Sequence, residues 1–326
     1  MPKKNKEECT MKRLDDYIAD ADTIVISGHV RPDGDCIGST LGCRHYIAAN
    51  YPEKQVSVYL ESFLEAFAVL PDTDVISREY PDRDDIDLFI SLDAASEDRL
   101  GDARKYLTCA KKTLCIDHHV SNPGFADVNI IEPQASSACE VLCKLLDPQK
   151  ITYGTAQCLY TGIVHDTGIF QYASTSPETM RIAASLMEYG IDHNLLIDET
   201  FNLKTYAQNR IMGKCLDSAR LYLDGKVIYT ALSAQDLTDY QVETKHLDGI
   251  AAMMRQTRGV LVSVFMYPLP DGRYKVSFRS NGTDVSCVAA RHGGGGHVRA
   301  AGCDMAGTEE EIRTLLLQDL KEVIGS

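Results

Sequence analysis

Histidines and aspartates gather in three short stretches of this sequence, and both residue types bind divalent metal ions. In order along the chain, they are His29, Asp33, Asp35, Asp93, Asp117, His118 and His119. A mixed set of imidazole and carboxylate ligands suits an ion such as manganese better than an all-thiolate set would. Two such ions, roughly 3.5–4 Å apart, hold the attacking and leaving oxygens of a phosphoryl transfer. The residue types therefore indicate metal-assisted cleavage of a phosphate ester.

Each residue taken alone has a plainer explanation. His29 could be a polar loop residue, and Asp33 with Asp35 could form a turn. Asp93 and Asp117 could each cap a following helix. The adjacent histidines of the third stretch are harder to dismiss, because a buried pair must find polar partners. Because Asp33 and Asp35 share one loop, which we expect to be extended, each could serve a different cation.

The three stretches follow three predicted strands. Thr23–Ser27, Asp87–Leu92 and Thr113–Ile116 are short apolar runs of the kind found in buried strands. Such runs alternate here with helical patterns, which predicts βαβ units and a parallel sheet. In open parallel sheets, ligands bind beyond the carboxyl ends of the strands. We therefore expect the three stretches to meet at one edge of one sheet, which favours the functional interpretation over chance.

The remaining elements divide the chain into a larger and a smaller part. Before residue 191 we expect further strands at Val56–Leu60 and Asn129–Ile131, and helices at Ile37–Ala49, Ser137–Leu146, Thr155–Val164 and from Ser176 to Gly190. Residues 192–217 have a mostly amphipathic helical pattern and are interpreted as a connector. After it we expect strands at Arg220–Leu223, Lys226–Ala231, Val260–Tyr267 and Arg273–Arg279, and helices at Leu247–Gln256 and Glu309–Ile324. The Asp224-Gly225 pair predicts a hairpin. This gives an α/β domain over 1–191 and a smaller α+β domain over 218–326.

The ordered motifs resemble those of the DHH phosphoesterase family. The resemblance rests on His29-x3-Asp33-x-Asp35, then Asp93, then Asp117-His118-His119, then Asp166-Thr167-Gly168. The run Gly293–His297, with Ala300-Ala301-Gly302 after it and Ser277–Ser280 before it, resembles the family's associated C-terminal domain. The resemblance extends from about residue 10 to the last helix. Within the family, the chain resembles the NrnA-type oligoribonucleases, many of which also dephosphorylate 3′-phosphoadenosine 5′-phosphate.

The resemblance implies a role for each matching residue. His29 and Asp33 would bind a first manganese ion, Asp35, His118 and Asp166 a second, and Asp93 both. His119 would lie beside the site, where it would either support a ligand or transfer a proton, and Asp117 would orient the histidines. The residues implied in substrate binding are Arg279, Ser280, Gly294, Gly295, Gly296 and His297. The active site would lie in the cleft between the two domains.

The glycine run has two interpretations on its own. Composition alone favours a flexible loop. Successive glycines also let backbone N–H groups approach an anion closely. Arg279 and His297 favour the second interpretation, because a guanidinium binds phosphate in a two-pronged way. His292 receives no role from the sequence.

The acidic charge of the chain limits its partners. Asp and Glu outnumber Lys and Arg by 47 to 33, which gives a formal net charge of -14. Proteins that bind long nucleic acids usually carry a basic surface. A small anionic substrate still fits, because bound metal ions invert the local charge of an acidic pocket. We expect a short oligonucleotide or a nucleotide as substrate and no long duplex, and the sequence leaves a homodimer open.

The cysteines and the apolar runs predict a location. The 11 cysteines form no C-x-x-C pair, so we interpret them as reduced thiols and expect a cytoplasmic protein. The basic start is not followed by an apolar segment, as a signal peptide would require. No apolar run approaches the roughly 18–20 residues that span a bilayer, so we expect no membrane contact.

Several functions share this set of motifs. The first is hydrolysis of short oligonucleotides, with or without 3′-phosphoadenosine 5′-phosphate. A second is hydrolysis of cyclic di-AMP or of linear signalling dinucleotides. Inorganic pyrophosphatases share the N-terminal motifs but lack the glycine-rich histidine signature. A nucleotide-binding regulator without catalysis is a fourth alternative, which the complete ligand set disfavours.

Overall fold

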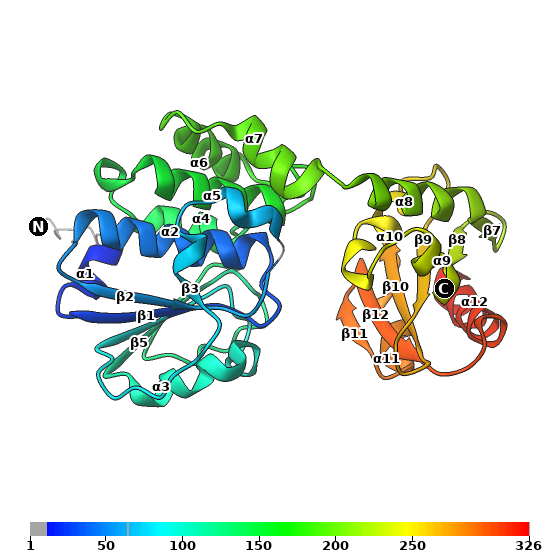
Figure 1. The fold of residues 1–326 in the computed structure, drawn as a ribbon, viewed down its shortest axis with the longest axis horizontal. Coiled ribbons are helices and arrows are strands. Elements are labelled where there is room, and N and C mark those ends of the chain that lie inside the picture. Colours follow the sequence, from blue (N-terminus) through cyan, green and yellow to red (C-terminus); the bar gives the residue numbers. More distant parts are fainter. Residues whose placement is uncertain (1–11, 64, 326) are drawn as a thin grey trace, which may run out of the picture. The chain divides into compact units, whose positions relative to one another are not determined.

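The computed structural model describes residues 12–63 and 65–325. The chain divides into two compact units, Met1–Leu203 and Lys204–Ser326, and each contains its own six-stranded sheet (Figure 1). The predicted connector, residues 192–217, contains a helix of each unit, and the boundary falls after Leu203. The functional domain limits stay a prediction.

The first unit is built on a parallel sheet, as predicted, with the strand order β3-β2-β1-β4-β5-β6. Its strands are β1 (Thr23–Ser27), β2 (Gln55–Tyr59), β3 (Ile76–Ser77), β4 (Leu88–Leu92), β5 (Lys112–Asp117) and β6 (Val128–Ile131). The chain runs outward from β1 to β3 and then returns to β4 on the other side of β1. The strand order therefore reverses between β1 and β4, which is where doubly wound sheets bind ligands.

Helices cover both faces of this sheet. Figure 1 shows α2, α4 and α5 on one face and α3 on the other. The α-helices of the unit are α1 (Leu14–Ile18), α2 (Gly34–Asn50), α3 (Tyr106–Cys109), α4 (Ala138–Leu145), α5 (Tyr153–Asp166), α6 (Pro177–Met187) and α7 (His193–Ile197). Short 3₁₀ segments lie at Glu65–Val69, Thr73–Val75, Glu97–Lys105 and Pro148–Lys150, and a π turn at Asp198–Asn202. The larger core lies under α2, α4 and α5.

Glycines bring α2 and α5 close together. A Cβ on Gly34 would lie 2.1 Å from the His165 ring, and one on Gly38 would lie 2.5 Å from the Cys158 carbonyl oxygen. The first residue of α2 thus contacts the last turn of α5, so the helices run antiparallel. This packing carries the C-terminal end of α5, where Asp166 lies, toward the N-terminal end of α2.

The second unit has the strand order β11-β12-β10-β9-β8-β7. Only β8 and β9 pair in parallel among these strands, and the other pairs are antiparallel. The strands are β7 (Arg220–Tyr222), β8 (Val227–Ala231), β9 (Val262–Pro268), β10 (Tyr274–Ser280), β11 (Gly295–His297) and β12 (Ala300–Met305). The helices are α8 (Tyr206–Ser218), α9 (Ala234–Asp239), α10 (Ile250–Arg255), α11 (Ser286–Arg291) and α12 (Glu309–Gly325), with a 3₁₀ turn at Thr244–His246. The predicted hairpin joins β7 to β8.

The structure also bears on the cysteines, on membrane-spanning helices and on His292. The described cysteines all carry free thiols, in agreement with the reduced state expected from their spacing. Across residues 12–63 and 65–325, no helix is both long and apolar enough to cross a membrane. His292, which the sequence left without a role, lies 2.7 Å from Asp319 and ties α11 to α12.

Candidate active site

The first element of the site is the loop that follows β1. His29 is 7% exposed, and its Nε2 atom lies 3.6 Å from Asp33 Oδ2 and 3.5 Å from Asp93 Oδ2. Its Nδ1 atom lies 2.8 Å from the Val30 carbonyl oxygen, which only accepts a hydrogen bond. Arg99 Nη2 also lies 3.2 Å from Nδ1, and the Val30 contact favours the tautomer with the proton on Nδ1, which leaves Nε2 to bind a metal ion. This tautomer is the one that a metal-binding histidine needs.

The segment containing Asp33 and Asp35 is not extended, so that expectation was wrong. Asp33 is the N-cap of α2, where its Oδ1 atom accepts hydrogen bonds from the amides of Asp35 and Cys36. Asp35 lies inside the first turn and is fully buried. Its carboxylate accepts hydrogen bonds from Ala138 N at 2.6 Å and Cys139 N at 3.0 Å, at the start of α4. The capping preference of aspartate, rather than strand geometry, decides where these two side chains point.

Asp93 lies between two groups of histidines. It is 2% exposed, follows β4 and has a left-handed backbone with φ of 54°. While its Oδ2 atom faces His29, its Oδ1 atom lies 3.6 Å from His118 Nε2 and 3.7 Å from His119 Nδ1. Oδ1 is buried and has no hydrogen-bond partner among the described residues. A buried carboxylate oxygen without a partner is costly, so this position suits a bound cation.

His118 and His119 follow β5 and face different partners. His118 Nε2 lies 3.2 Å from Asp166 Oδ2 and 4.0 Å from Asp35 Oδ2. His119 Nδ1 lies 2.8 Å from Asp117 Oδ1, and Asp117 is fully buried. The structure therefore brings together all six sequence-predicted metal ligands, with the two predicted catalytic residues beside them.

The distances fit ligands that share ions better than direct hydrogen bonds. Two ligand atoms that each lie about 2.1 Å from one ion are about 3–4 Å apart. The separations from His29 and His118 to the neighbouring carboxylates run from 3.2 to 4.0 Å. Four carboxylates and two histidines surround the space, and two divalent cations would balance the four negative charges. The residues present therefore fit a pair of divalent ions.

Crowding of charge shifts the pKa values of these groups. Burial and the neighbouring Asp93 raise the pKa of Asp35 to about 7. Burial, then the Asp35 and Asp93 carboxylates, hold the pKa of Asp166 well above its ordinary value. Burial lowers the pKa of His118, but the surrounding carboxylates outweigh burial and raise it to about 10. So much negative charge in a buried space is what a cation site requires.

Asn122 is a member of the site that sequence reasoning missed. Its side-chain amide donates to Asp117 Oδ2 at 2.6 Å and to the Ala94 carbonyl oxygen at 3.0 Å. Asn122 therefore links Asp117, which orients His119, to Ala94, which directly follows Asp93. Its place five residues after Asp117 could have marked it as a candidate, but only the fold shows both partners.

In the second unit, the strand register brings together two of the residues implied in substrate binding. Arg279 of β10 is opposite Ala300 of β12, and Ala300 is opposite His297 of β11. Directly opposed residues share a face of a sheet, so Arg279 and His297 flank a small alanine about 10 Å apart. Two residues along the strands, Gly295 and Gly302 are opposed on this same face. We call the partly exposed surface made by these residues the Arg279–His297 face.

The other predicted substrate residues lie differently. Ser280 is buried, and its hydroxyl donates to the Thr283 carbonyl oxygen, on the face opposite to Arg279. Gly294 and Gly296 have a packing role, because a Cβ would lie 2.2 Å from the Gly302 oxygen or 2.5 Å from the Ala300 oxygen. The close approach of these glycines to β12 accounts for both, and the second half of the glycine run, Gly295–His297, forms the edge strand β11.

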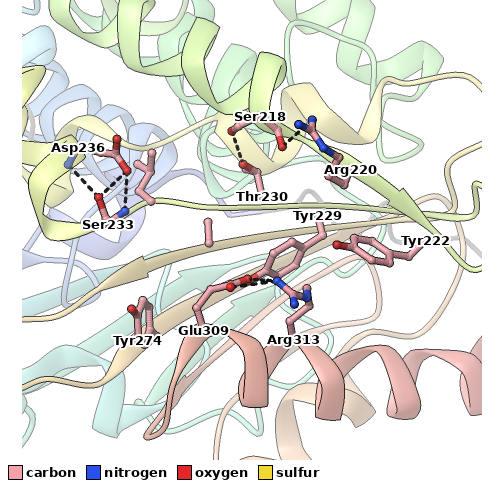
Figure 2. Close-up of a pocket in the computed structure, with 12 residues that line it drawn as sticks. Ser218, Arg220, Tyr222, Tyr229, Thr230, Ser233, Asp236, Tyr274, Glu309 and Arg313 are labelled. Carbon is pink, nitrogen blue, oxygen red and sulfur yellow. Dashed lines mark hydrogen bonds and ion pairs between the residues drawn. The ribbon is translucent and has the colours of Figure 1, made fainter.

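A pocket elsewhere in the second unit is lined by neither Arg279 nor His297. Figure 2 shows this pocket of about 330 Å³, which lies beside the start of α12. Its polar groups pair with one another: Glu309 accepts from Tyr229 at 2.6 Å and from Arg313 at 2.7 Å. Because none of these charged groups lacks a partner, nothing in the pocket indicates a ligand.

Comparison with known proteins agrees with this geometry. Residues 23–163 match the DHH family, N-terminal domain, and residues 224–326 match the DHHA1 domain. The probable bifunctional oligoribonuclease and PAP phosphatase NrnA of Streptococcus mutans is 31% identical over 314 residues, which is 93% of this chain and 95% of that protein. The chain belongs to the DHH family. As a DHH-family protein, it is an enzyme that hydrolyses phosphate esters.

Other relatives of this DHH enzyme extend the likeness. The bifunctional oligoribonuclease and PAP phosphatase NrnA of Thermus thermophilus is 30% identical and covers 88% of this chain and 85% of its own length. An exopolyphosphatase-related protein from Bacteroides fragilis has a similar structure, with a TM-score of 0.88 and 27% identity over 95% of this chain and 96% of that one. The family and the fold are therefore supported over nearly the whole chain.

Proposed function

We propose that this chain is a manganese-dependent phosphoesterase that hydrolyses very short oligonucleotides and removes a phosphate from 3′-phosphoadenosine 5′-phosphate. The observation that carries the proposal is Asp93, a buried carboxylate that divides its two oxygens between His29 and His118. Two relatives named as oligoribonucleases and PAP phosphatases support this choice of substrate. The acidic net charge of -14 supports a short substrate over a long one.

Each proposed ligand is held by its own neighbours. His29 and Asp33 would bind one ion, and Asp93 would bind both ions. Asp35, His118 and Asp166 would bind the second ion, with Asp35 fixed by two amides of α4. When bound, the ions would neutralise the charge on phosphate and make a water molecule more acidic.

His119 is proposed to give a proton to the leaving oxygen. Its Nδ1 atom donates to Asp117 at 2.8 Å, and this bond fixes the direction of the ring. Nε2 is then the atom that remains for proton transfer to a substrate. Asp117 in turn is held by Asn122, so the histidine is oriented through a chain of two hydrogen bonds.

The Arg279–His297 face is proposed to bind a phosphate of the substrate away from the bond that is cleaved. The guanidinium of Arg279 and the imidazole of His297 flank small residues, which leaves room for an anion at the level of the strands. A charged hydrogen bond to phosphate contributes roughly 1.5–3 kcal/mol. This face therefore explains how an acidic chain could hold a nucleotide.

A panel of substrates tests the proposal directly. Purified enzyme with manganese would be given the linear dinucleotide pApA, 3′-phosphoadenosine 5′-phosphate, cyclic di-AMP, pyrophosphate and a long single strand. We expect the highest kcat/KM for pApA, clear activity on the bisphosphate, and a steep fall for the long strand. An Asp93→Asn protein purified in parallel controls for contaminating nucleases.

The panel also separates the rival functions. A preference for cyclic di-AMP would replace the proposal with a signalling phosphodiesterase. Activity confined to pyrophosphate would mean that the Arg279–His297 face binds no nucleotide. Equal kcat/KM values for the dinucleotide and the long strand would indicate a processive exonuclease instead.

A further inference from the structure

The turn that follows α5 has an unusual backbone. Gly168, Ile169 and Phe170 all have left-handed backbones, with φ of 55°, 54° and 61°. Left-handed conformations are unfavourable for residues with a side chain, above all for a β-branched residue such as Ile169. The turn is fixed by hydrogen bonds, including Ile169 N to the Val164 oxygen at 2.8 Å. Strain of this kind is found where the surrounding structure imposes it, often at functional sites.

The turn places the ring of Tyr172 against Gly168, close in the chain to the proposed ligand Asp166. Tyr172 N donates to the Thr167 oxygen at 2.9 Å, which folds the chain back on itself. As a result, a Cβ on Gly168 would lie 2.4 Å from Tyr172 Cζ and 2.6 Å from Cε1, so the ring lies against the glycine. Gly168 is two residues from Asp166, which is at most about 7 Å of backbone.

This ring is also open to solvent. Tyr172 is 50% exposed, although it is a large aromatic residue next to a buried cluster. Its hydroxyl makes no hydrogen bond to any residue within 12–63 or 65–325. The side chain is therefore fixed by its backbone and by the contact with Gly168, while about half of its surface is exposed.

We propose that Tyr172 is a platform on which the base of the substrate stacks, next to the phosphate that is hydrolysed. The inference rests on the proposed function, since it assumes a nucleotide at the metal ligands. Every nucleobase has a flat π-face, and stacking on an aromatic side chain tolerates any sequence. The platform therefore predicts that the enzyme accepts all four bases and binds substrates without a base more weakly.

The test compares substrates with and without a base. We expect Tyr172→Ala to lower kcat/KM on pApA about 5- to 100-fold, the range expected for the loss of one stacked base. On the same dinucleotide with an abasic 5′ residue, the variant and the wild type should differ by about twofold or less. Tyr172→Phe keeps the ring and should restore the rate on pApA.

Tyr153, at the opposite end of α5 from the turn that holds Tyr172, provides a matched control. Tyr153 is the first residue of α5 and is also 50% exposed, but it lies about 20 Å from Asp166 along the helix. Tyr153→Ala should leave both rates unchanged. Equal losses for Tyr172→Ala on the two dinucleotides would overturn the platform, because they would mean that the ring only supports the turn.

Binding separates this inference from the proposed function. Calorimetry with manganese would compare adenosine 5′-monophosphate with ribose 5-phosphate, which lacks the base. The wild type should prefer the adenosine compound about 5- to 100-fold, and Tyr172→Ala should lose that preference. Failure of pApA hydrolysis with this preference intact would contradict only the proposed function. No preference in the wild type would overturn the platform.

Discussion

The two units of this chain use polar residues in opposite ways. In the first unit, five carboxylates and three histidines lie close together, most of them buried or half-buried, and one oxygen of Asp93 has no partner among the described residues. In the second unit, Arg279 and His297 lie on an accessible face among glycines and alanines. A buried cluster can fix ions and reacting atoms precisely enough for chemistry, whereas an open face can bind an anion but does little to activate it.

The largest effect should come from the residue that divides its oxygens between the two proposed ions. Asp93→Asn replaces one carboxylate oxygen with an amide that cannot bind a cation. We expect kcat on pApA to fall about a thousandfold or more, because both ions lose a ligand at once. Circular dichroism should show an unchanged fold. Near-normal turnover with two ions bound would show that Asp93 does not bridge them.

The first unit was the more predictable of the two. β1 has the predicted limits, because Thr23–Ser27 is a short run of mostly apolar, β-branched residues, which favour a buried strand. Five of the six proposed ligands could be predicted because they follow three such strands. The assignment of Asp166 as a ligand came only from the family resemblance. The sequence places it at the end of a helix but does not show that this helix packs beside α2. Asn122 could not be identified because its role depends on contacts with Asp117 and Ala94 that only the fold creates.

The second unit was harder to predict. β11 and β12 consist largely of glycine and alanine, which have low strand propensity, so the pairing of β11 with β12 and of β12 with β10 depends on tertiary contacts. Arg279 and His297 are 18 residues apart in sequence, and only the strand register shows that they share a face.

In the first unit, the sequence wrongly predicted an extended Asp33–Asp35 segment. Asp33 is instead the N-cap of α2, and Asp35 lies in its first turn.

A smaller effect should follow from the loss of Asn122. Asn122→Ala removes the amide that holds Asp117 and Ala94, so His119 and Asp93 should become less well oriented. We expect kcat on pApA to fall about ten- to a hundredfold, with a smaller change in KM. Asn129→Ala is the control, because Asn129 also bridges two backbone groups, those of Ala126, but does so at the exposed start of β6. Equal losses in both variants would assign Asn122 a general structural role.

The smallest effect concerns stability rather than catalysis. Asp87 accepts hydrogen bonds from Lys111 and from the amides of Thr23 and Asp22, and these lower its pKa to about 2. Because the folded pKa lies below the ordinary value of about 4, the carboxylate stabilises the fold above pH 4. That stabilisation is lost as the pH falls from about 4 to 2.

Asp87→Asn should therefore lower the free energy of unfolding by about 1 kcal/mol at pH 7. The difference from the wild type should shrink as the pH falls below about 4. Urea unfolding of metal-free protein, followed by circular dichroism at several pH values, would measure it. A difference that stays constant from pH 7 to pH 3 would show that the charge of Asp87 is not what stabilises the first strand.

The most direct test of the division between the two units is a comparison of two variants on two substrates. His118→Ala removes a proposed metal ligand, and Arg279→Ala removes a proposed phosphate contact. On pApA, both should lower kcat/KM, Arg279→Ala by about ten- to a hundredfold. On bis-p-nitrophenyl phosphate, which has no nucleotide, His118→Ala should still lower the rate strongly while Arg279→Ala should change it little. Equal losses for Arg279→Ala on both substrates would place that residue at the reacting phosphate and contradict the account.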